Sequence, residues 1–224
     1  MFYKIKLIYN KIRLNYFAND YNLDGNDAVR YNSLENVNKL NREISHFEKN
    51  LHNDMKFIEK IYPLVQKNIN HIEDKVIDVG CGSGILVSKL IKDTALNNAF
   101  GCDFSSEKII KCKAVHNISN FFVHDVYNKF DEKYDVIVCT EVLEHLENPD
   151  DALINLLSSL NPRGKLIISV PDGRKDIFSG HINFWSPESF NIYINKLVNT
   201  SCGEYDLQFH YIDFKNVCVI QVLS

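Results

Sequence analysis

The sequence predicts an α/β fold with a largely parallel β-sheet. From residue 75 onward, short apolar runs alternate with stretches of helical periodicity, which is the order typical of βαβ units. The first apolar run ends in a glycine-rich turn, and the next two end at Asp103 and Asp125. Polar residues at successive strand ends are expected where an open parallel sheet forms a ligand site.

The apolar runs are interpreted as strands because they are short and rich in β-branched or aromatic residues. The final two runs follow each other across a short turn, so we expect them to form an antiparallel pair. In chain order, the predicted strands cover 75–79, 99–102, 121–124, 134–139, 165–170, 205–214 and 216–222.

Helices are predicted between these strands, over 85–92, 105–116, 149–160 and 186–198. The third helix is capped by Asn148 and begins at Pro149, and the fourth starts in the same style with Ser186-Pro187. Proline suits the first turn of a helix, where the missing amide would have no partner. Residues 161–164 are predicted to form the turn after the third helix.

The first part of the chain differs from the rest in composition and periodicity. Residues 1–73 are rich in Asn, Tyr, Lys and Glu and show mainly helical periodicity, with helices predicted over 33–52 and 54–66. Pro63 is expected to bend or interrupt the second of these. We therefore divide the chain into an N-terminal helical cap or lid region, 1–73, and a core, 74–224.

Composition and charge exclude several classes of protein. The formal net charge of −4 offers no broad positive field, so DNA is not an expected partner and RNA is disfavoured. No apolar run reaches the roughly 18–20 residues of a membrane-spanning helix. The six cysteines form no C-x-x-C pair, which predicts reduced, buried thiols in a cytoplasmic protein. We expect a monomer or a homodimer.

Gly80, Gly82 and Gly84 follow the first strand directly. Glycines there allow unusual backbone angles and let the backbone approach a ligand closely. The dinucleotide fingerprint would require a further glycine where Ile85 stands, so a nicotinamide cofactor is disfavoured. A simple strand-to-helix turn is the alternative interpretation of the glycines alone.

Carboxylates at the strand ends narrow the ligand. Asp78 lies in the first strand and could anchor a positive amino group. Asp103 ends the second strand and could accept hydrogen bonds from two ribose hydroxyls. Phe104 could stack on adenine, and Asp125 could accept from its exocyclic amine. Together with the glycines, these residues favour an adenosine ligand over the alternative of helix caps and turn formers.

The segments VIDVGCGSG, GCDFS, VHDVYN, YDVIVCTEVLEHLENPDDAL and LNPRGKLIISVP resemble, in this order, class I S-adenosylmethionine (SAM)-dependent methyltransferases of the small-molecule types 11 and 23. The resemblance covers about residues 74–222. It implies a Rossmann-like sheet of about seven strands, mostly parallel with the last strand antiparallel, and helices on both faces. It implies SAM as cofactor, and its binding residues would be Asp78, Gly80, Cys81, Gly82, Asp103, Phe104, Asp125, Val126 and Thr140.

A second constellation follows the fourth strand. Glu141, Glu144 and His145 have the spacing that places three side chains on one face of a helix. His181 stands much later, shortly before the final helix. Two carboxylates and two imidazoles form a plausible set of ligands for Mg²⁺, Mn²⁺ or Zn²⁺.

This E-x-x-E-H pattern with a distant histidine is similar to two groups of the superfamily, the small-RNA 2′-O-methyltransferases and the ubiquinone-biosynthesis O-methyltransferases. The resemblance implies that Glu141, Glu144, His145 and His181 bind a metal that lowers the pKa of a substrate hydroxyl. The alternative is a metal-free role, with Glu144, His145 and His181 acting catalytically or shaping the pocket, or a purely structural role.

The favoured function is methyl transfer from SAM to an oxygen, or less favourably a nitrogen, of a small molecule such as a sugar or a surface-glycan precursor in a bacterial cytoplasm. A metal-dependent RNA 2′-O-methyltransferase and a non-catalytic SAM-binding protein are the two alternatives. Trp185 is assigned equally to the acceptor pocket and to the core.

Overall fold

The protein is described by a computed structural model that covers residues 55–201 and 203–223. The predicted helix over 33–52 lies outside these residues, as does most of the predicted cap region. A helix covers 55–68 and runs unbroken through Pro63, so the predicted interruption is wrong. Pro63 is exposed, and the carbonyl that loses its helical partner there can be hydrated by solvent.

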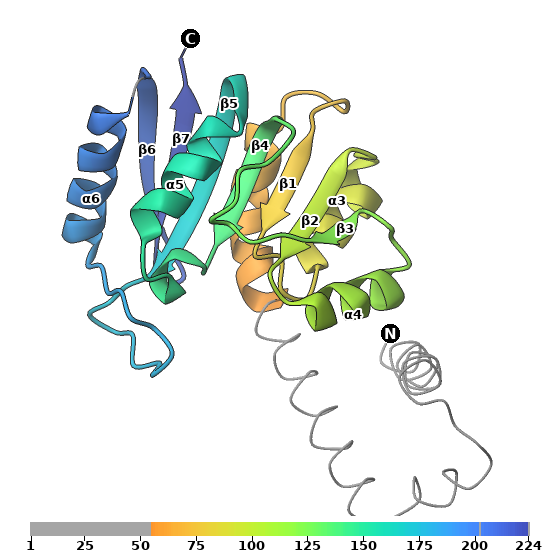
Figure 1. Cartoon of the computed structure of the whole chain (residues 1–224), viewed down its shortest axis with the longest axis horizontal. Coiled ribbons are helices and arrows are strands. Elements are labelled where there is room, and N and C mark those ends of the chain that lie inside the picture. The colour runs from red at the N-terminus through yellow and green to blue at the C-terminus, as the bar shows by residue number, and fades with distance from the viewer. Residues whose placement is uncertain (1–54, 202, 224) are drawn as a thin grey trace, which may run out of the picture.

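A single mixed sheet forms the centre of the described chain (Figure 1). Its strand order is β3-β2-β1-β4-β5-β7-β6. All pairings are parallel except those of β7, which runs antiparallel to both β5 and β6. This confirms the predicted sheet. The strands are β1 (Val76–Val79), β2 (Ala99–Asp103), β3 (Phe121–Val123), β4 (Tyr134–Thr140), β5 (Leu160–Pro171), β6 (Tyr205–Ile212) and β7 (Lys215–Val222).

The helices between the strands lie close to their predicted positions. Ser105 caps its helix through a hydrogen bond from the Lys108 amide, and Ser186 does the same through the amide of Ser189. Asn148 occupies the predicted cap position but its side chain makes no capping bond. The helices are α3 (Ile85–Thr94), α4 (Ser106–His116), the short 3-10 helix η2 (Leu143–His145), α5 (Pro149–Ser158) and α6 (Pro187–Thr200).

One boundary differs from expectation. Residues 161–164 belong to strand β5, although a turn is predicted there. Leu160 pairs with Tyr134 before the register shifts between Tyr134 and Val136, and Asn161 donates a hydrogen bond to Asp135 at 2.8 Å. The pairing then resumes at Lys165, and Arg163 between them has a left-handed φ of 63°, so residues 161–164 form an irregular insertion at the start of β5.

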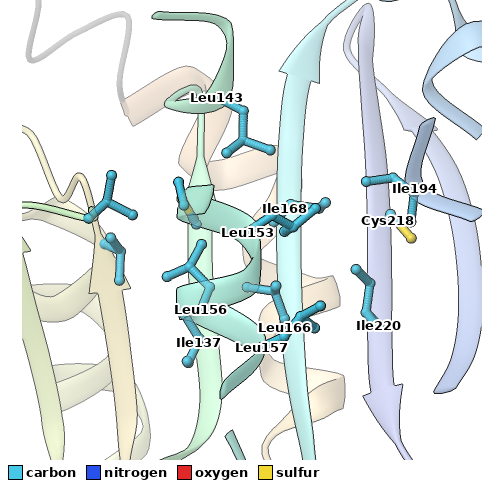
Figure 2. Close-up of a cluster of buried hydrophobic side chains, with 14 of the residues drawn as sticks. Ile137, Leu143, Leu153, Leu156, Leu157, Leu166, Ile168, Ile194, Cys218 and Ile220 are labelled. Atoms are coloured by element: carbon cyan, nitrogen blue, oxygen red, sulfur yellow. The ribbon is translucent and has the colours of Figure 1, made fainter. Parts of the chain in front are cut away.

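Two apolar clusters cover the two faces of the sheet. One joins the 55–68 helix to α3 and α4, and it contains Ile61 and Val65 with no exposed surface. The other joins α5 and α6 to the opposite face. Leu143 of η2 is fully buried at one end of this second cluster, beyond Leu153 and Ile168 (Figure 2). Burying such a side chain contributes about 1.5–3 kcal/mol, so Leu143 anchors η2 to the core.

The remaining features of the described chain agree with the composition. None of its helices combines the length and apolar character needed to cross a bilayer. Its free cysteines, Cys81, Cys102, Cys112, Cys139 and Cys218, are all buried. Trp185 packs against the second cluster, with its ring centre 5.2 Å from that of Tyr193. Of the two roles predicted for Trp185, this packing corresponds to the role in the core.

Candidate active site

The strand order reverses between β1 and β4, and the segments that follow β1, β4 and β5 converge at the same edge of the sheet (Figure 1). Ligands of open α/β sheets bind at such a switch point. The contact is close, because a Cβ added to Gly80 would lie 2.4 Å from Cγ2 of Val142. The candidate site is therefore built from the glycine loop after β1, the η2 segment and the loop over 172–186.

The glycine loop has the backbone that its sequence predicts. Gly80, Gly82 and Gly84 have φ values of 73°, 50° and 72°, in the left-handed region where a side chain is strained. The amides of Gly80 and Cys81 both donate to the carbonyl of Cys102, at 2.8 and 2.9 Å. The loop is thus tied to the end of β2.

Asp103 completes this connection. Its carboxylate is 3% exposed and accepts hydrogen bonds from the amides of Gly82, at 3.2 Å, and Ser105, at 3.0 Å. Lys108 approaches the same carboxylate at 3.4 Å. The structure therefore brings Asp103 and the glycine loop together, as the sequence predicts.

The other predicted cofactor residues surround this pair. Asp78, Cys81 and Val126 are buried, and Thr140 is half-buried at the end of β4. Phe104 is 77% exposed. Asp125 is exposed beyond β3 and accepts a hydrogen bond from the Tyr127 amide at 3.0 Å. Their contacts with a cofactor stay predictions.

Glu144, His145 and His181 form a compact trio. One ligand atom from each of the three side chains lies within 4.8 Å of the others. The two imidazole ring centres are 4.6 Å apart, with the rings inclined at 71°. His181 Nε2 lies 3.8 Å from the Glu144 carboxylate. The distant histidine and the E-x-x-E-H segment therefore do meet.

Each histidine of the trio has its Nδ1 engaged elsewhere. His145 Nδ1 lies 3.0 Å from the carbonyl of Gly180, which can only accept, so Nδ1 carries the proton. His181 Nδ1 is hydrogen-bonded to Asp176. Burial opposes ionisation of Asp176, but the bonds from His181 and from the Phe178 amide outweigh it and lower its pKa. Nδ1 of each ring therefore faces an acceptor, which leaves Nε2 as the nitrogen that could bind a metal.

Glu144 is the unusual member. Its side chain is 1% exposed, and neither carboxyl oxygen has a hydrogen-bond partner among the described residues. Burial, and next the charge of Glu141, raise its pKa to about 9. A buried carboxyl group without a partner is costly. A cation among the three side chains would remove that cost.

The loop over 172–186 is held tightly to η2. The amides of Ile182 and Asn183 donate to the Glu144 carbonyl, at 2.9 and 3.1 Å. The Asn183 side chain donates to the carbonyls of Leu143 and Leu146. These bonds fix His181 against Glu144 without help from a ligand.

Glu141 does not join the trio. Its backbone has a φ of 58°, uncommon outside glycine, and η2 begins only at Leu143. The single helical face predicted for Glu141, Glu144 and His145 is therefore not formed. Instead, Glu141 accepts a hydrogen bond from Ser169 at 2.9 Å and pairs with Lys215.

A hollow of about 580 Å³ has His145 as the one member of the trio in its wall. Glu147 and Asp151 give it negative charge, and Ile154 adds an apolar surface. The remaining lining residues are Tyr127, Leu146, Asn148 and Asn155. Its volume suits a small molecule.

A model of the methyltransferase domain family matches residues 39–196, which is most of the chain. The chain belongs to this family. The matched residues span the glycine loop, Asp103 and the trio, and together with the named relatives the match shows a SAM-dependent methyltransferase. The enzyme class expected from the sequence is confirmed.

Relatives and solved structures agree with the family. The ubiquinone biosynthesis O-methyltransferase of Rickettsia bellii is 27% identical, over 74% of this chain and 75% of its own. A SAM-dependent methyltransferase from Clostridium acetobutylicum has the same fold, with a TM-score of 0.61 and 12% identity over 83% of this chain and all of its own. The methyltransferase domain of bacterial CtHen1 aligns with a TM-score of 0.56 and 24% identity, over 67% of this chain and 91% of its own.

Three residues of the methyltransferase site are absent from the sequence-based set. Asp176 and Asn183 lie in a loop for which sequence periodicity gives no template, and Lys215 starts a strand far along the chain. A carboxylate five residues before His181 is the one local signal that could have pointed to Asp176, since metal-binding histidines are commonly oriented by carboxylates. Lys215 has no local signal.

Proposed function

We propose that this methyltransferase transfers the methyl group of SAM to a hydroxyl oxygen of a small molecule, with a divalent cation bound by Glu144, His145 and His181. The observation that carries the proposal is the buried Glu144 carboxyl group, which has no hydrogen-bond partner among the described residues and faces two imidazoles. The donor set of one carboxylate and two imidazoles suits Mn²⁺ or Zn²⁺ better than Mg²⁺.

The cation would supply Lewis acidity that lowers the pKa of the acceptor hydroxyl. The hydroxyl proton would pass to water, the acceptor oxygen would take the methyl group, and S-adenosylhomocysteine would leave as the second product. The protein's own residues would do the rest. Gly180 and Asp176 hold the two imidazoles in the ligating tautomer. Phe178 lies near both rings, 6.3 and 4.9 Å from their centres, and gives that side of the trio an aromatic surface. The glycine loop and Asp103 would hold SAM so that its methyl group faces the acceptor.

The acceptor is proposed only as a class. The sequence favours a sugar or a surface-glycan precursor, and the name of the Rickettsia relatives adds a ubiquinone precursor as a candidate. The carboxylates of Glu147 and Asp151 in the wall of the hollow disfavour a phosphate-rich acceptor, because like charges repel. An RNA 2′-O-methyltransferase, supported by the E-x-x-E-H pattern, is therefore the second candidate.

The test is transfer of tritium from methyl-labelled SAM to hydroxyl acceptors of three kinds, namely catechol, nucleotide sugars and short RNA. Each reaction is run with chelator and after Mn²⁺ is restored. The proposal expects transfer to a small hydroxyl acceptor that the chelator abolishes and Mn²⁺ restores. Full activity of metal-free protein would exclude the cation. Methylation of RNA alone, weakened steeply by salt, would favour the second candidate.

A non-catalytic SAM-binding role makes a different prediction. Calorimetry would then show SAM binding, but no S-adenosylhomocysteine would accumulate with any acceptor. For the chelator and Mn²⁺ experiment, the matched control is the Glu144→Gln variant. This substitution keeps the size of the side chain and removes the charge that would hold the cation.

A further inference from the structure

Glu141 and Lys215 form an ion pair at the edge of the proposed metal site. Lys215 is the first residue of β7, and its ammonium group contacts Glu141 Oε2. The other oxygen of Glu141 accepts from Ser169 on β5. Both oxygens of this carboxylate are therefore occupied, whereas neither oxygen of Glu144, three residues later, has a hydrogen-bond partner among the described residues.

The backbone supports this separation of the two carboxylates. Glu141 has a left-handed φ of 58°, a conformation that costs a non-glycine residue on the order of 1–3 kcal/mol unless its surroundings enforce it. Its amide donates to the carbonyl of Ser169 at 3.0 Å. The strained residue is thus held to β5 by its main chain and its side chain, and to β7 by Lys215.

Lys215 also links the site to the rest of the protein. Its ammonium group lies 5.1 Å from the ring centre of Phe57, in the helix over 55–68. The ion pair is mostly shielded, with the Lys215 and Glu141 side chains 23% and 26% exposed. A partly shielded pair of this kind is screened less by water than an exposed one.

From this arrangement we propose that Lys215 is a positioning residue that keeps Glu141 out of the coordination sphere, so that Glu144, His145 and His181 alone bind the cation. The inference rests on the metal site of the proposed function. In this arrangement Lys215 neutralises the charge of Glu141. The cation then has one protein ligand fewer, which leaves more coordination positions open to an acceptor. In the absence of Lys215, the half-buried carboxylate of Glu141 would have no counter-ion. A cation bound at Glu144, three residues further along the chain, would then attract this carboxylate into its coordination sphere.

Metal affinity measured on a set of variants tests the inference. Mn²⁺ is titrated calorimetrically into the full chain as wild type, Lys215→Met, Glu141→Gln, and the double variant Glu141→Gln/Lys215→Met. Lys215→Met keeps the apolar stem beside Phe57. We expect the Lys215→Met variant to bind Mn²⁺ at least about tenfold more tightly than the wild type. Tenfold is the lower end of the affinity changes that substitutions next to metal ligands cause.

The double variant separates ligation from simple charge removal. If Glu141 becomes a ligand, the gain disappears in the double variant, whose affinity stays within about threefold of wild type. Glu141→Gln alone is also expected to stay within about threefold. Co²⁺ absorption gives a second readout, since its spectrum reports the ligand set. It should change in Lys215→Met and return to the wild-type form in the double variant.

Lys89→Met is the matched control. Lys89 also lies over an aromatic ring, 4.5 Å from the centre of Tyr62, and also pairs with a carboxylate, that of Asp93, but it belongs to α3 and contacts no residue of the trio. It should leave Mn²⁺ affinity unchanged. An unchanged or weaker affinity in Lys215→Met, or a gain that persists in the double variant, would overturn the inference while wild-type binding still supported the proposed function. Absence of Mn²⁺ binding in every variant would overturn both.

Discussion

His181 Nε2 lies 3.8 Å from the Glu144 carboxylate, although the two residues come from segments that follow different strands. The loop over 172–186 brings them together through bonds to the main chain of η2. The buried carboxyl group of Glu144 has no hydrogen-bond partner among the described residues, and the proposed cation site rests on this observation.

Asp176→Asn should weaken metal binding through the tautomer of His181. The Phe178 amide donates to Asp176 Oδ1, so the new amide nitrogen must face His181 Nδ1 and donate to it. The imidazole proton then moves to Nε2, where it blocks ligation. We expect a 10- to 100-fold loss of Mn²⁺ affinity by calorimetry. The exposed Asp131 provides the control, and equal losses in Asp176→Asn and Asp131→Asn would contradict the role of Asp176.

Gly80→Ala should disrupt the cofactor loop. The new methyl group would meet Val142 at 2.4 Å, and φ of 73° adds strain of about 1–2 kcal/mol. We expect lower thermal stability and loss of S-adenosylhomocysteine binding by calorimetry. Adding Val142→Ala removes the clash and leaves the strain, so it should restore stability only in part. Normal binding in the single variant would show that the loop adapts.

Asp103→Asn tests the predicted ribose contact. A charged acceptor that holds hydroxyl groups is worth about 1.5–3 kcal/mol per hydrogen bond, so S-adenosylhomocysteine should bind at least about tenfold more weakly. Lys108→Met is the comparison, because Lys108 approaches the same carboxylate from an exposed position and should change the affinity little. Unchanged affinity in Asp103→Asn would remove Asp103 from the cofactor site.

Asp172, the first residue of the loop over 172–186, should contribute to the free energy of unfolding in a way that is lost at acidic pH. Bonds from Arg174, and also one from Tyr211 at 2.8 Å, lower its pKa against the opposing effect of burial. A carboxylate whose pKa is lower when folded stabilises the protein above its unfolded value of about 3.9, and the contribution is lost as pH falls through the folded value.

Urea unfolding of the wild type and Asp172→Asn over a pH series measures this contribution. The difference in unfolding free energy should be largest near neutral pH and should narrow below about pH 4. Tyr211→Phe, which removes one of the donors, should show a smaller difference with the same trend. A difference that stays constant down to pH 3 would mean that Asp172 does not act through its charge.

The sequence was most informative where the chemistry is local. Gly80, Gly82 and Asp103 follow strands directly, so their spacing alone placed them at one edge of the sheet. Glu141 escaped prediction because helical spacing assumes a helix, and here the backbone turns left-handed before η2 begins. Its partner Lys215 lies 74 residues away, and no local pattern connects residues so distant.

The same difference between local and long-range effects appears at the boundaries of helices and strands. Ser105 and Ser186 marked two helix starts correctly because capping is a short-range effect. The turn predicted over 161–164 lies within β5 as an irregular insertion, because the pairing with β4 passes from Leu160 directly to Lys165 and Arg163 has a left-handed φ of 63°. The Pro63 helix survived because its packing against the sheet, through Ile61 and Val65, outweighs the bond lost at Pro63.

The most direct test of the metal site is the shift in thermal unfolding that Mn²⁺ causes in the wild type and in Glu144→Gln. A cation that binds only the folded state at 100 times its dissociation constant adds about 2.7 kcal/mol of stability. The wild type should therefore melt at a clearly higher temperature with Mn²⁺, while Glu144→Gln should not respond. An equal shift in both proteins, or none in the wild type, would contradict a cation bound by Glu144, His145 and His181.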